Sequence, residues 1–187
     1  MRNKYYILRH GEAVSNKKGI ISCWPEKVPN PLTKKGIGQI KIAVRKLIDK
    51  KIDLIFSSDL LRTRQTAEII GKELKIKPRR DKRLREYNVG IFNGKTIKDF
   101  RKFLPTGIKR FKIHSPKGET YIDIKERMYN FLKEIDERYS GKTILIISHQ
   151  LPLILLEGKV KGFSNQGIIK KYPKKKRIKT GELRKLL

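Results

Sequence analysis

Two histidines and two arginines stand at the ends of apolar runs, or in the first turn of a helical pattern that follows one. These residues are Arg9, His10, Arg62 and His149. The runs are "YYIL" (5–8), "LIFSS" (54–58) and "TILIIS" (143–148), each short and strand-like in composition. Because the carboxyl ends of parallel strands meet at one edge of a sheet, we expect the four side chains to converge there. Arginine offers paired donors to phosphate oxygens, so this set predicts a phosphate-binding pocket.

The apolar runs alternate with amphipathic patterns of helical period. Helices are predicted after Thr33 as N-cap, over 59–74 with Asp59 at the start, over 96–103, over 119–139 and over 164–172. The apolar stripes are Ile37, Ile40, Val44, Leu47 and Ile48 in the first helix, and Tyr121, Ile124, Met128, Phe131, Leu132 and Ile135 in the longest. This alternation predicts an α/β fold with a mostly parallel central sheet.

The chain has 187 residues, and we expect it to form a single domain over 1–187. Its basic C-terminal segment, about 164–187, completes or flanks that domain. One alternative places an edge strand around 177–183, where lysines discourage pairing with other chains. The other makes the segment a mobile basic tail that closes over the substrate or touches polyanions.

The sequence also carries an expectation about location. No apolar run has membrane-spanning length, and the first residues, "MRNKYYILRH", show no signal peptide, so we expect no membrane partner. The single cysteine, Cys23, cannot form an internal disulfide, which fits a reducing compartment. A cytoplasmic location is therefore predicted.

The composition is strongly basic, with 47 Lys and Arg against 18 Asp and Glu and a formal net charge of +29. Such a charge suits nucleic-acid or other polyanion binding through counterion release. The basic residues are spread along the chain, however, with no aromatic stacking platform and no recognition-helix pattern among them. We therefore favour a compositional enrichment of lysine across the surface, or a general attraction for anionic small molecules, over specific nucleic-acid binding. A small phosphorylated metabolite is the expected partner.

Several segments together resemble the motifs of the histidine phosphatase superfamily, in its phosphoglycerate mutase-like branch. They are "LRHGEAVSN" (8–16), "NPLTKKGIGQ" (30–39), "SSDLLRTRQTA" (57–67), "LREYNVGIFNG" (84–94), "SPKGETYIDIKERM" (115–128) and "ILIISHQ" (144–150). They occur in family order and span Ile7 to about Leu156. The resemblance implies a three-layer α/β/α fold.

The resemblance also implies a role for each site residue. His10 is cast as a nucleophile that attacks phosphorus and forms a phosphohistidine, with Glu86 as the acid for the leaving group and then the base for water. Arg9, Arg62, Asn16 and His149 are cast as donors to the phosphoryl oxygens, and Ser22 as a further donor. The arginines supply the charge that Mg²⁺ supplies in other phosphoryl-transfer enzymes. We therefore expect no metal and no cofactor.

Some assignments have competitors in the sequence. Arg64 shares a helix with Arg62 but projects differently, so one of the two is expected on the surface, and the motif favours Arg62. Glu73 or Glu119 could replace Glu86 as the carboxylate, although Glu119 suits the cap of the long helix beside Gly118. The third histidine, His114, lies outside every motif and is expected in a substrate loop or on the surface.

Departures from the family pattern favour a phosphatase over a mutase. Cys23 stands where mutases tend to have a glycine beside the phosphate, and Gln150 replaces the usual glycine after the second histidine. The segment between Thr66 and Glu86 is short, whereas a mutase needs enclosing material to retain its product. The sequence therefore predicts a metal-independent phosphatase of small phosphate monoesters. Mutase-type phosphotransfer and a polyanion-binding protein on this scaffold remain the alternatives, and the oligomeric state stays open.

Overall fold

The computed structural model describes residues 1–105 and 107–186. Within them, five strands form one sheet in the order β3-β2-β4-β1-β5. The strands are β1 (Lys4–Arg9), β2 (Leu54–Ser57), β3 (Arg79–Arg80), β4 (Thr143–Ser148) and β5 (Leu183–Lys185). The first four run parallel and β5 is antiparallel to β1, so the sheet is mostly parallel, as predicted. The apolar run of β4 lies at the centre, where both of its faces are buried.

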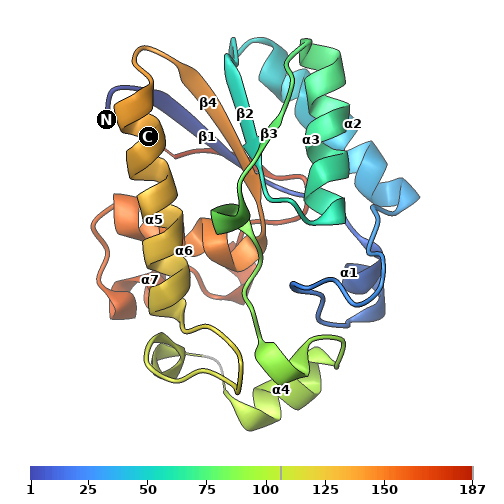
Figure 1. Cartoon of the computed structure of the whole chain (residues 1–187), viewed down its shortest axis with the longest axis vertical. Coiled ribbons are helices and arrows are strands. Elements are labelled where there is room, and N and C mark those ends of the chain that lie inside the picture. Colours follow the sequence, from blue (N-terminus) through green and yellow to red (C-terminus); the bar gives the residue numbers. More distant parts are fainter. Residues whose placement is uncertain (106, 187) are drawn as a thin grey trace.

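Helices cover both faces of the sheet and make three layers (Figure 1). The helices are α1 (Val14–Lys18), α2 (Lys34–Ile48), α3 (Leu61–Leu74), α4 (Ile97–Phe103), α5 (Tyr121–Arg138), α6 (Gln150–Val160) and α7 (Asn165–Lys171). One buried cluster joins α2 and α3 to one face of the sheet, and a larger one joins α5 and α6 to the other. Successive residues of β4 alternate between the two clusters, because side chains of a strand point to opposite faces. The predicted α/β/α architecture is confirmed.

The predicted elements agree with the structure in type and differ in detail. All six apolar residues predicted for the longest helix are buried in α5. In α2, by contrast, Ile37 and Ile48 are 38% and 61% exposed, and Gly36 and Ala43 are buried in their place. The prediction for those two isoleucines was wrong because helix α2 turns a narrower face to the sheet than its apolar residues span. The short helix α1 lies in a stretch for which the sequence predicted no helix.

Two predicted helix starts were also wrong. Leu60 is the N-cap of α3, and the Asp59 carboxylate instead accepts hydrogen bonds from Arg85 at 2.5 and 2.8 Å. Thr120 caps α5 in a capping box with Asp123. An acidic residue near a helix start is therefore not always its cap, because an arginine nearby competes for the carboxylate.

The C-terminal segment is folded against the rest of the chain through Leu186. Helix α7 lies within the predicted range 164–172, with Ser164 as its N-cap, but the edge strand lies at Leu183–Lys185 and not over 177–183. Residues 174–180 instead cross the carboxyl edge of the sheet. There the Arg9 and Gln150 side chains both donate hydrogen bonds to the Ile178 carbonyl. Lys185 nevertheless occupies the edge strand, in line with the predicted lysine-rich edge.

A contact between two glycines fixes the end of β1 on helix α2. A Cβ placed on Gly36 would lie 2.0 Å from the Glu12 carbonyl oxygen, and one on Gly11 would lie 2.5 Å from the Gly36 carbonyl oxygen. Only glycine at both positions lets the two backbones approach this closely. The Thr33 N–H also donates to the Glu12 carbonyl at 2.8 Å. The residues after the Arg9–His10 pair are therefore anchored to the start of α2.

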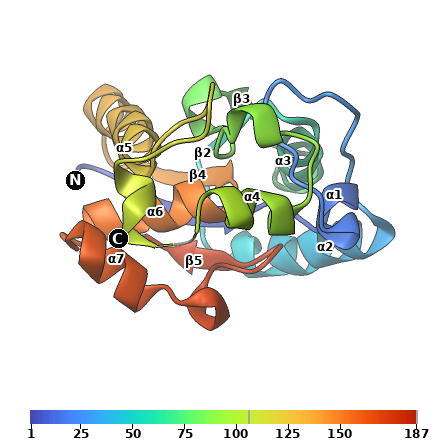
Figure 2. The same cartoon turned by 90° about the horizontal axis from the view of Figure 1, so that it is seen from below.

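Seen from below, α4 lies across the carboxyl edge of the sheet, between α1 and the C-terminal segment (Figure 2). Helices within the described residues are too short or too polar to cross a membrane.

Candidate active site

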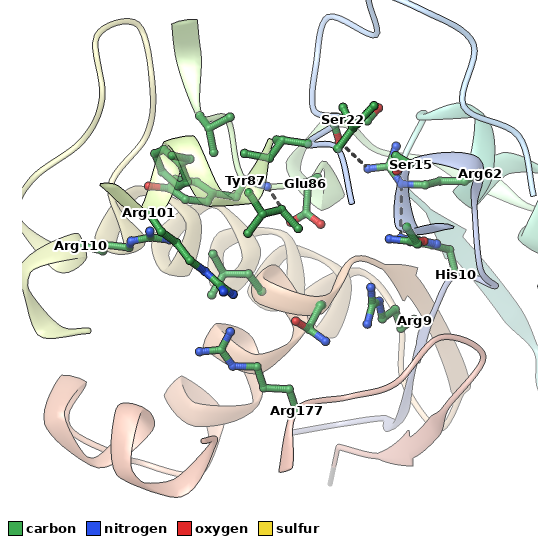
Figure 3. A pocket seen from close by; sticks show the side chains of 18 of the residues that line it. Arg9, His10, Ser15, Ser22, Arg62, Glu86, Tyr87, Arg101, Arg110 and Arg177 are labelled. Atoms are coloured by element: carbon green, nitrogen blue, oxygen red, sulfur yellow. Dashed lines mark hydrogen bonds between the residues drawn. The ribbon is translucent and has the colours of Figure 1, made fainter. Parts of the chain in front are cut away.

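A cavity of about 210 Å³ lies at the carboxyl edge of the sheet, between the strand ends and α4 (Figure 3). Its basic lining residues are Arg9, Arg62, Arg101, Arg110 and Arg177. Among the described residues, Glu86 supplies the one carboxylate of this lining. The cavity is therefore strongly positive, as a site for an anion requires.

His10 lies at the end of β1 and is 1% exposed. Its Nδ1 is 2.7 Å from the Gly11 carbonyl oxygen, which can only accept, so Nδ1 carries the ring proton. Its Nε2 accepts a hydrogen bond from Arg62 Nε at 3.3 Å. Burial first, and then the charges of Arg62 and Arg9, hold the pKa of His10 well below 6.5. The imidazole is therefore neutral, with its lone pair on Nε2.

Arg62 is fixed by groups from three parts of the chain. It lies in the first turn of α3 and is 2% exposed. Besides its bond to His10, its Nη1 pairs with Glu26 at 3.2 Å and its Nη2 donates to the Ser22 carbonyl at 3.0 Å. The Glu26 carboxylate also accepts the N–H of Leu61 at 2.9 Å. Residues 22–26 therefore hold the guanidinium plane against His10.

Arg9 is the last residue of β1, directly before His10, and it carries a second guanidinium into the cavity (Figure 3). Its Nη1 donates to the Ile178 carbonyl at 3.1 Å. Its Nε is buried and has no hydrogen-bond partner within residues 1–105 and 107–186. An anion in the cavity is a natural partner for the remaining N–H groups.

His149 follows β4 and is fully buried. Its ring lies edge-on to that of His10, with 5.1 Å between the ring centroids. Its Nε2 is 3.1 Å from Ser58 Oγ, which accepts the Leu60 N–H and can donate its own proton to Nε2. In the tautomer that this bond suits, the ring proton of His149 is on Nδ1. Nδ1 is buried, has no hydrogen-bond partner among the described residues, and lies 3.9 Å from the Glu86 carboxylate.

The electrostatic setting of the second histidine resembles that of the first. Burial, followed by the charge of Arg62, holds the pKa of His149 well below 6.5. Its contact with Glu86 is therefore between a neutral ring and a carboxyl group, not an ion pair. A neutral Nδ1–H remains able to donate one hydrogen bond.

Glu86 faces the cavity from the loop that follows the short helical turn Lys82–Leu84. Its Oε1 accepts the N–H of Tyr87 at 2.9 Å. Burial raises the pKa of Glu86 and outweighs the opposing effects of Arg62 and the Tyr87 N–H. This carboxyl group therefore keeps its proton to a higher pH than an ordinary glutamate, as a general acid must.

The family model of the histidine phosphatase superfamily (branch 1) matches residues 5–170. The chain belongs to the histidine phosphatase superfamily. It is 34% identical over 164 residues to "Probable phosphoglycerate mutase GpmB" of Escherichia fergusonii, covering 84% of this chain and 74% of the relative. The protein of the same name from Yersinia pestis is 32% identical over 155 residues, covering 79% and 70%.

Solved histidine phosphatase structures share the fold. Bacillus stearothermophilus YhfR superposes with a TM-score of 0.78 at 28% identity, covering 89% of this chain and 83% of the other. The alpha-ribazole phosphatase of Shigella flexneri gives 0.78 at 24% identity, covering 96% and 88%. A mycobacterial glucosyl-3-phosphoglycerate phosphatase gives 0.78 at 21%, covering 88% and 83%. The last two establish the fold alone.

The structure brings the predicted site residues of this member of the histidine phosphatase superfamily together. His10, Arg9, Arg62, Glu86, Asn16 and Ser22 all line the cavity, and His149 lies against His10 without being part of the lining. The Asn16 Oδ1 accepts the N–H of Ala13, which leaves its amide nitrogen to donate. Ser22 contributes its carbonyl to Arg62 and lines the wall with the rest of the residue.

The competing residues lie elsewhere or have other partners. Glu119 accepts the Asn88 N–H and pairs with Arg127 at 2.8 Å, and His114 is exposed. Neither Glu73 nor Arg64 lines the cavity. Within the described residues, groups of three or more metal-ligating side chains do not occur.

Four residues at or beside the cavity were missed by sequence reasoning: Glu26, Arg101, Arg110 and Arg177. Glu26 stands in a proline-rich loop with no helical or strand-like period, so its neighbours could not be foreseen. The three arginines lie among many other basic residues, which hides those that face the site. No signal in the sequence separates them from the surface lysines.

Proposed function

We propose that this chain hydrolyses small phosphate monoesters through a phosphohistidine on His10, without a metal ion. The observation that carries the proposal is the state of His10, a buried neutral imidazole whose Nδ1 donates to the Gly11 carbonyl and whose Nε2 lone pair accepts from Arg62, with the charge of Arg9 nearby. Such a nitrogen is a nucleophile that needs no separate base. The positive lining supplies the charge that binds the dianionic phosphate.

In the first step the His10 Nε2 lone pair attacks phosphorus and the ester P–O bond breaks. Arg62 Nε releases Nε2 and, together with Arg9, donates to the phosphoryl oxygens. The leaving alkoxide takes the proton of Glu86. The raised pKa of Glu86 suits this role, because the carboxyl group must be protonated when substrate binds.

In the second step water attacks the phosphohistidine and the P–N bond breaks. The Glu86 carboxylate, now without its proton, accepts the proton of the water. Phosphate leaves, His10 Nε2 regains its lone pair, and Glu86 is again protonated. One ester and one water become one alcohol and one phosphate.

His149 donates from its Nδ1–H to a phosphoryl oxygen in both steps. Support comes from its contact with the Ser58 hydroxyl, which can donate to Nε2 and so suits a proton on Nδ1, and from the absence of any other partner for Nδ1 among the described residues. A buried donor without a partner costs about 1–3 kcal/mol, which a bound phosphoryl group would recover.

Hydrolysis is favoured over mutase chemistry by the short segment that borders the cavity. Between Glu86 and α5, the described residues hold one α-helix that can cover the cavity, the seven-residue α4. The two phosphatases named above superpose over 88% and 96% of this chain. The relatives named phosphoglycerate mutase keep the mutase as the alternative, supported by 34% identity.

The test is release of inorganic phosphate from p-nitrophenyl phosphate and a panel of metabolite monoesters in excess EDTA. Wild type and His114→Ala, changed at an exposed histidine, should be active, and His10→Ala should lose at least about a thousandfold in kcat. Loss of wild-type activity in EDTA would contradict the metal-free route. Interconversion of phosphoglycerates that depends on a bisphosphoglycerate primer, with little phosphate released, would instead establish the mutase.

A further inference from the structure

Two basic hollows lie outside the active-site cavity, one on each side of the turn Lys174–Lys176. The first, of about 460 Å³, lies between α2 and the C-terminal segment (Figure 2), and its basic lining residues are Lys46, Lys175, Lys176, Arg177, Lys179 and Arg184. The second, of about 570 Å³, lies between α4 and the turn, and its basic lining residues are Lys98, Arg101, Lys102 and Lys174. Because successive residues of the turn line the two hollows, these side chains form one surface, which we call the basic band.

The positive charge of the basic band is not neutralised by the chain itself. Among the described residues that line the two hollows, Glu182 supplies the one carboxylate, and it pairs with Arg184 at 2.7 Å. Within residues 1–105 and 107–186, the lysines that have a carboxylate within 4.0 Å all lie outside the band. Elsewhere the charges are mixed, as where Arg83 pairs with Asp81 and Glu134. The band is therefore a surface of free cations.

The lysines of the turn stand on backbone that the fold holds in place. The Lys176 carbonyl accepts a hydrogen bond from Arg184 at 3.1 Å, and the Ile178 carbonyl accepts one from Gln150 at 3.0 Å. The segment also lies beyond residues 5–170, which match the family model. The cations of the band are therefore arranged before any partner binds, which lowers the entropy that binding must cost.

The shape and lining of the band favour one kind of anionic partner. Among the described residues that line the two hollows, none is aromatic, so unpaired bases would find no surface to stack on. Each hollow has one exposed isoleucine, Ile42 or Ile97, which offers little apolar area to a lipid surface. Fixed cations in a concave surface instead suit a ridge of regularly spaced phosphates, which a nucleic-acid duplex carries on its outside.

We propose that the basic band binds the sugar–phosphate backbone of double-stranded nucleic acid, without regard to sequence. The lysines and arginines contact phosphates and release condensed counterions. Contacts to phosphates alone carry no sequence information. This inference goes beyond the proposed phosphatase function and does not depend on it, because the lysines of the band do not line the active-site cavity.

The experiment measures binding of labelled DNA and RNA duplexes by fluorescence anisotropy over a range of salt concentrations. The wild type should bind at physiological salt with a Kd of about 10⁻⁵ M, and equally for duplexes of different sequence. The logarithm of the binding constant should fall with the logarithm of the salt concentration, with a slope of about −0.9 for each phosphate contacted. Tighter binding of a single strand, or of phosphatidylserine vesicles, than of either duplex would overturn the proposal.

Matched variants separate the basic band from the general positive charge of the chain. The band variant is Lys98→Gln/Lys175→Gln/Lys176→Gln/Lys179→Gln, and its control at the opposite edge of the sheet is Lys4→Gln/Lys50→Gln/Lys72→Gln/Lys77→Gln. All of these side chains are exposed, so both variants should unfold at the wild-type temperature. The band variant should bind the duplex at least about tenfold more weakly, with a salt slope less steep by about 3, and the control should lose no more than about threefold. Equal losses would show a diffuse field and contradict the band.

Two further readouts place the duplex on the molecule without relying on the lysine variants. Acetylation of lysines with and without duplex, followed by peptide mass spectrometry, should show protection of Lys174–Lys176 and none of Lys72. His10→Ala should bind the duplex as the wild type does, and a loss there would place the nucleic acid in the active-site cavity and contradict the band. If the wild type binds duplex but hydrolyses no ester, the phosphatase proposal fails and the band stands. If it hydrolyses esters and binds no duplex, the band alone fails.

Discussion

The two ends of the cavity are built from different parts of the chain and carry their charges in different ways. At the reaction end, His10 and Arg62 follow strands of the central sheet and are almost fully buried. A hydrogen bond joins the two side chains, and Arg62 also forms an ion pair with Glu26. At the far end, Arg101 is exposed and Arg177 is partly exposed, on a short helix and on an irregular segment. The difference teaches that the sheet fixes the positions of the residues at the reaction end, while the far end is built from segments that can vary without disturbing them.

The largest effect is expected from Glu86→Gln, which removes the acid and base at the reaction end. For an alkyl phosphate, whose leaving group needs a proton, kcat/KM should fall by about 10²–10⁴-fold. For p-nitrophenyl phosphate the loss in kcat/KM should be much smaller, because nitrophenolate leaves without protonation, whereas kcat should fall on both esters because the base for the second step is gone. Steady-state kinetics on both esters tests the assignment, and equal losses of kcat/KM on the two would argue against Glu86 as the acid.

The pH profile gives a second readout of the same variant. Because the pKa of Glu86 is raised, kcat/KM should fall as pH rises through that pKa and the group loses its proton. Because the pKa of His10 is lowered, the acid limb should lie well below pH 6.5. The falling alkaline limb should be absent from Glu86→Gln, and its persistence there would assign that limb to another group.

Gly36→Ala tests how firmly the reaction end is tied to the scaffold. The new methyl group would lie 2.0 Å from the Glu12 carbonyl oxygen, so the contact between β1 and α2 must open. We expect a loss of about 2–4 kcal/mol in the free energy of unfolding, measured by urea denaturation. The control is Gly38→Ala on the same helix, where a Cβ would meet no atom within 4 Å. Equal stability of the two variants would contradict the proposed anchor.

The buried histidines should make stability depend on pH. In the folded chain the pKa values of His10 and His149 lie well below 6.5, so below pH 6.5 the unfolded chain binds protons that the folded chain does not. Each histidine should therefore cost up to about 1.4 kcal/mol per pH unit as pH falls below 6.5. In His10→Asn this loss should be smaller, and in His114→Asn, at an exposed position, it should match the wild type. An unchanged slope in His10→Asn would contradict the neutral buried ring.

The smallest effect is expected from Glu26→Gln, which loosens the reaction end without removing a reacting group. Arg62 would keep its bond to the Ser22 carbonyl but lose its ion pair, and kcat should fall several-fold. The matched control is Glu68→Gln, whose ion pair with Arg80 is on the surface and away from the cavity. A kcat equal to the wild type in Glu26→Gln would show that the backbone contacts alone orient Arg62.

The reaction end could be predicted from sequence because its residues follow strands, whose apolar runs are visible and whose ends must meet at one edge. The far end could not: Arg101 lies in the predicted helix over 96–103, but its sequence does not show against which part of the molecule that helix packs, and Arg177 lies in an irregular segment. The same reason explains the errors in the fold. The edge strand β5 is three residues long, and the starts of α3 and α5 depend on whether Asp59 and Glu119 bind an arginine instead of capping a helix.

The most direct test of the central claim is to look for the phosphoenzyme. Rapid quenching of the wild type during turnover of an alkyl phosphate, under alkaline conditions that preserve phosphohistidine, followed by peptide mass spectrometry, should place one phosphoryl group on His10. The same protocol on Glu86→Gln, once loaded from p-nitrophenyl phosphate, should show a larger phosphorylated fraction, because the base for hydrolysis is absent. Turnover with no phosphoryl group on His10 in either protein, or with the group on another residue, would contradict the account.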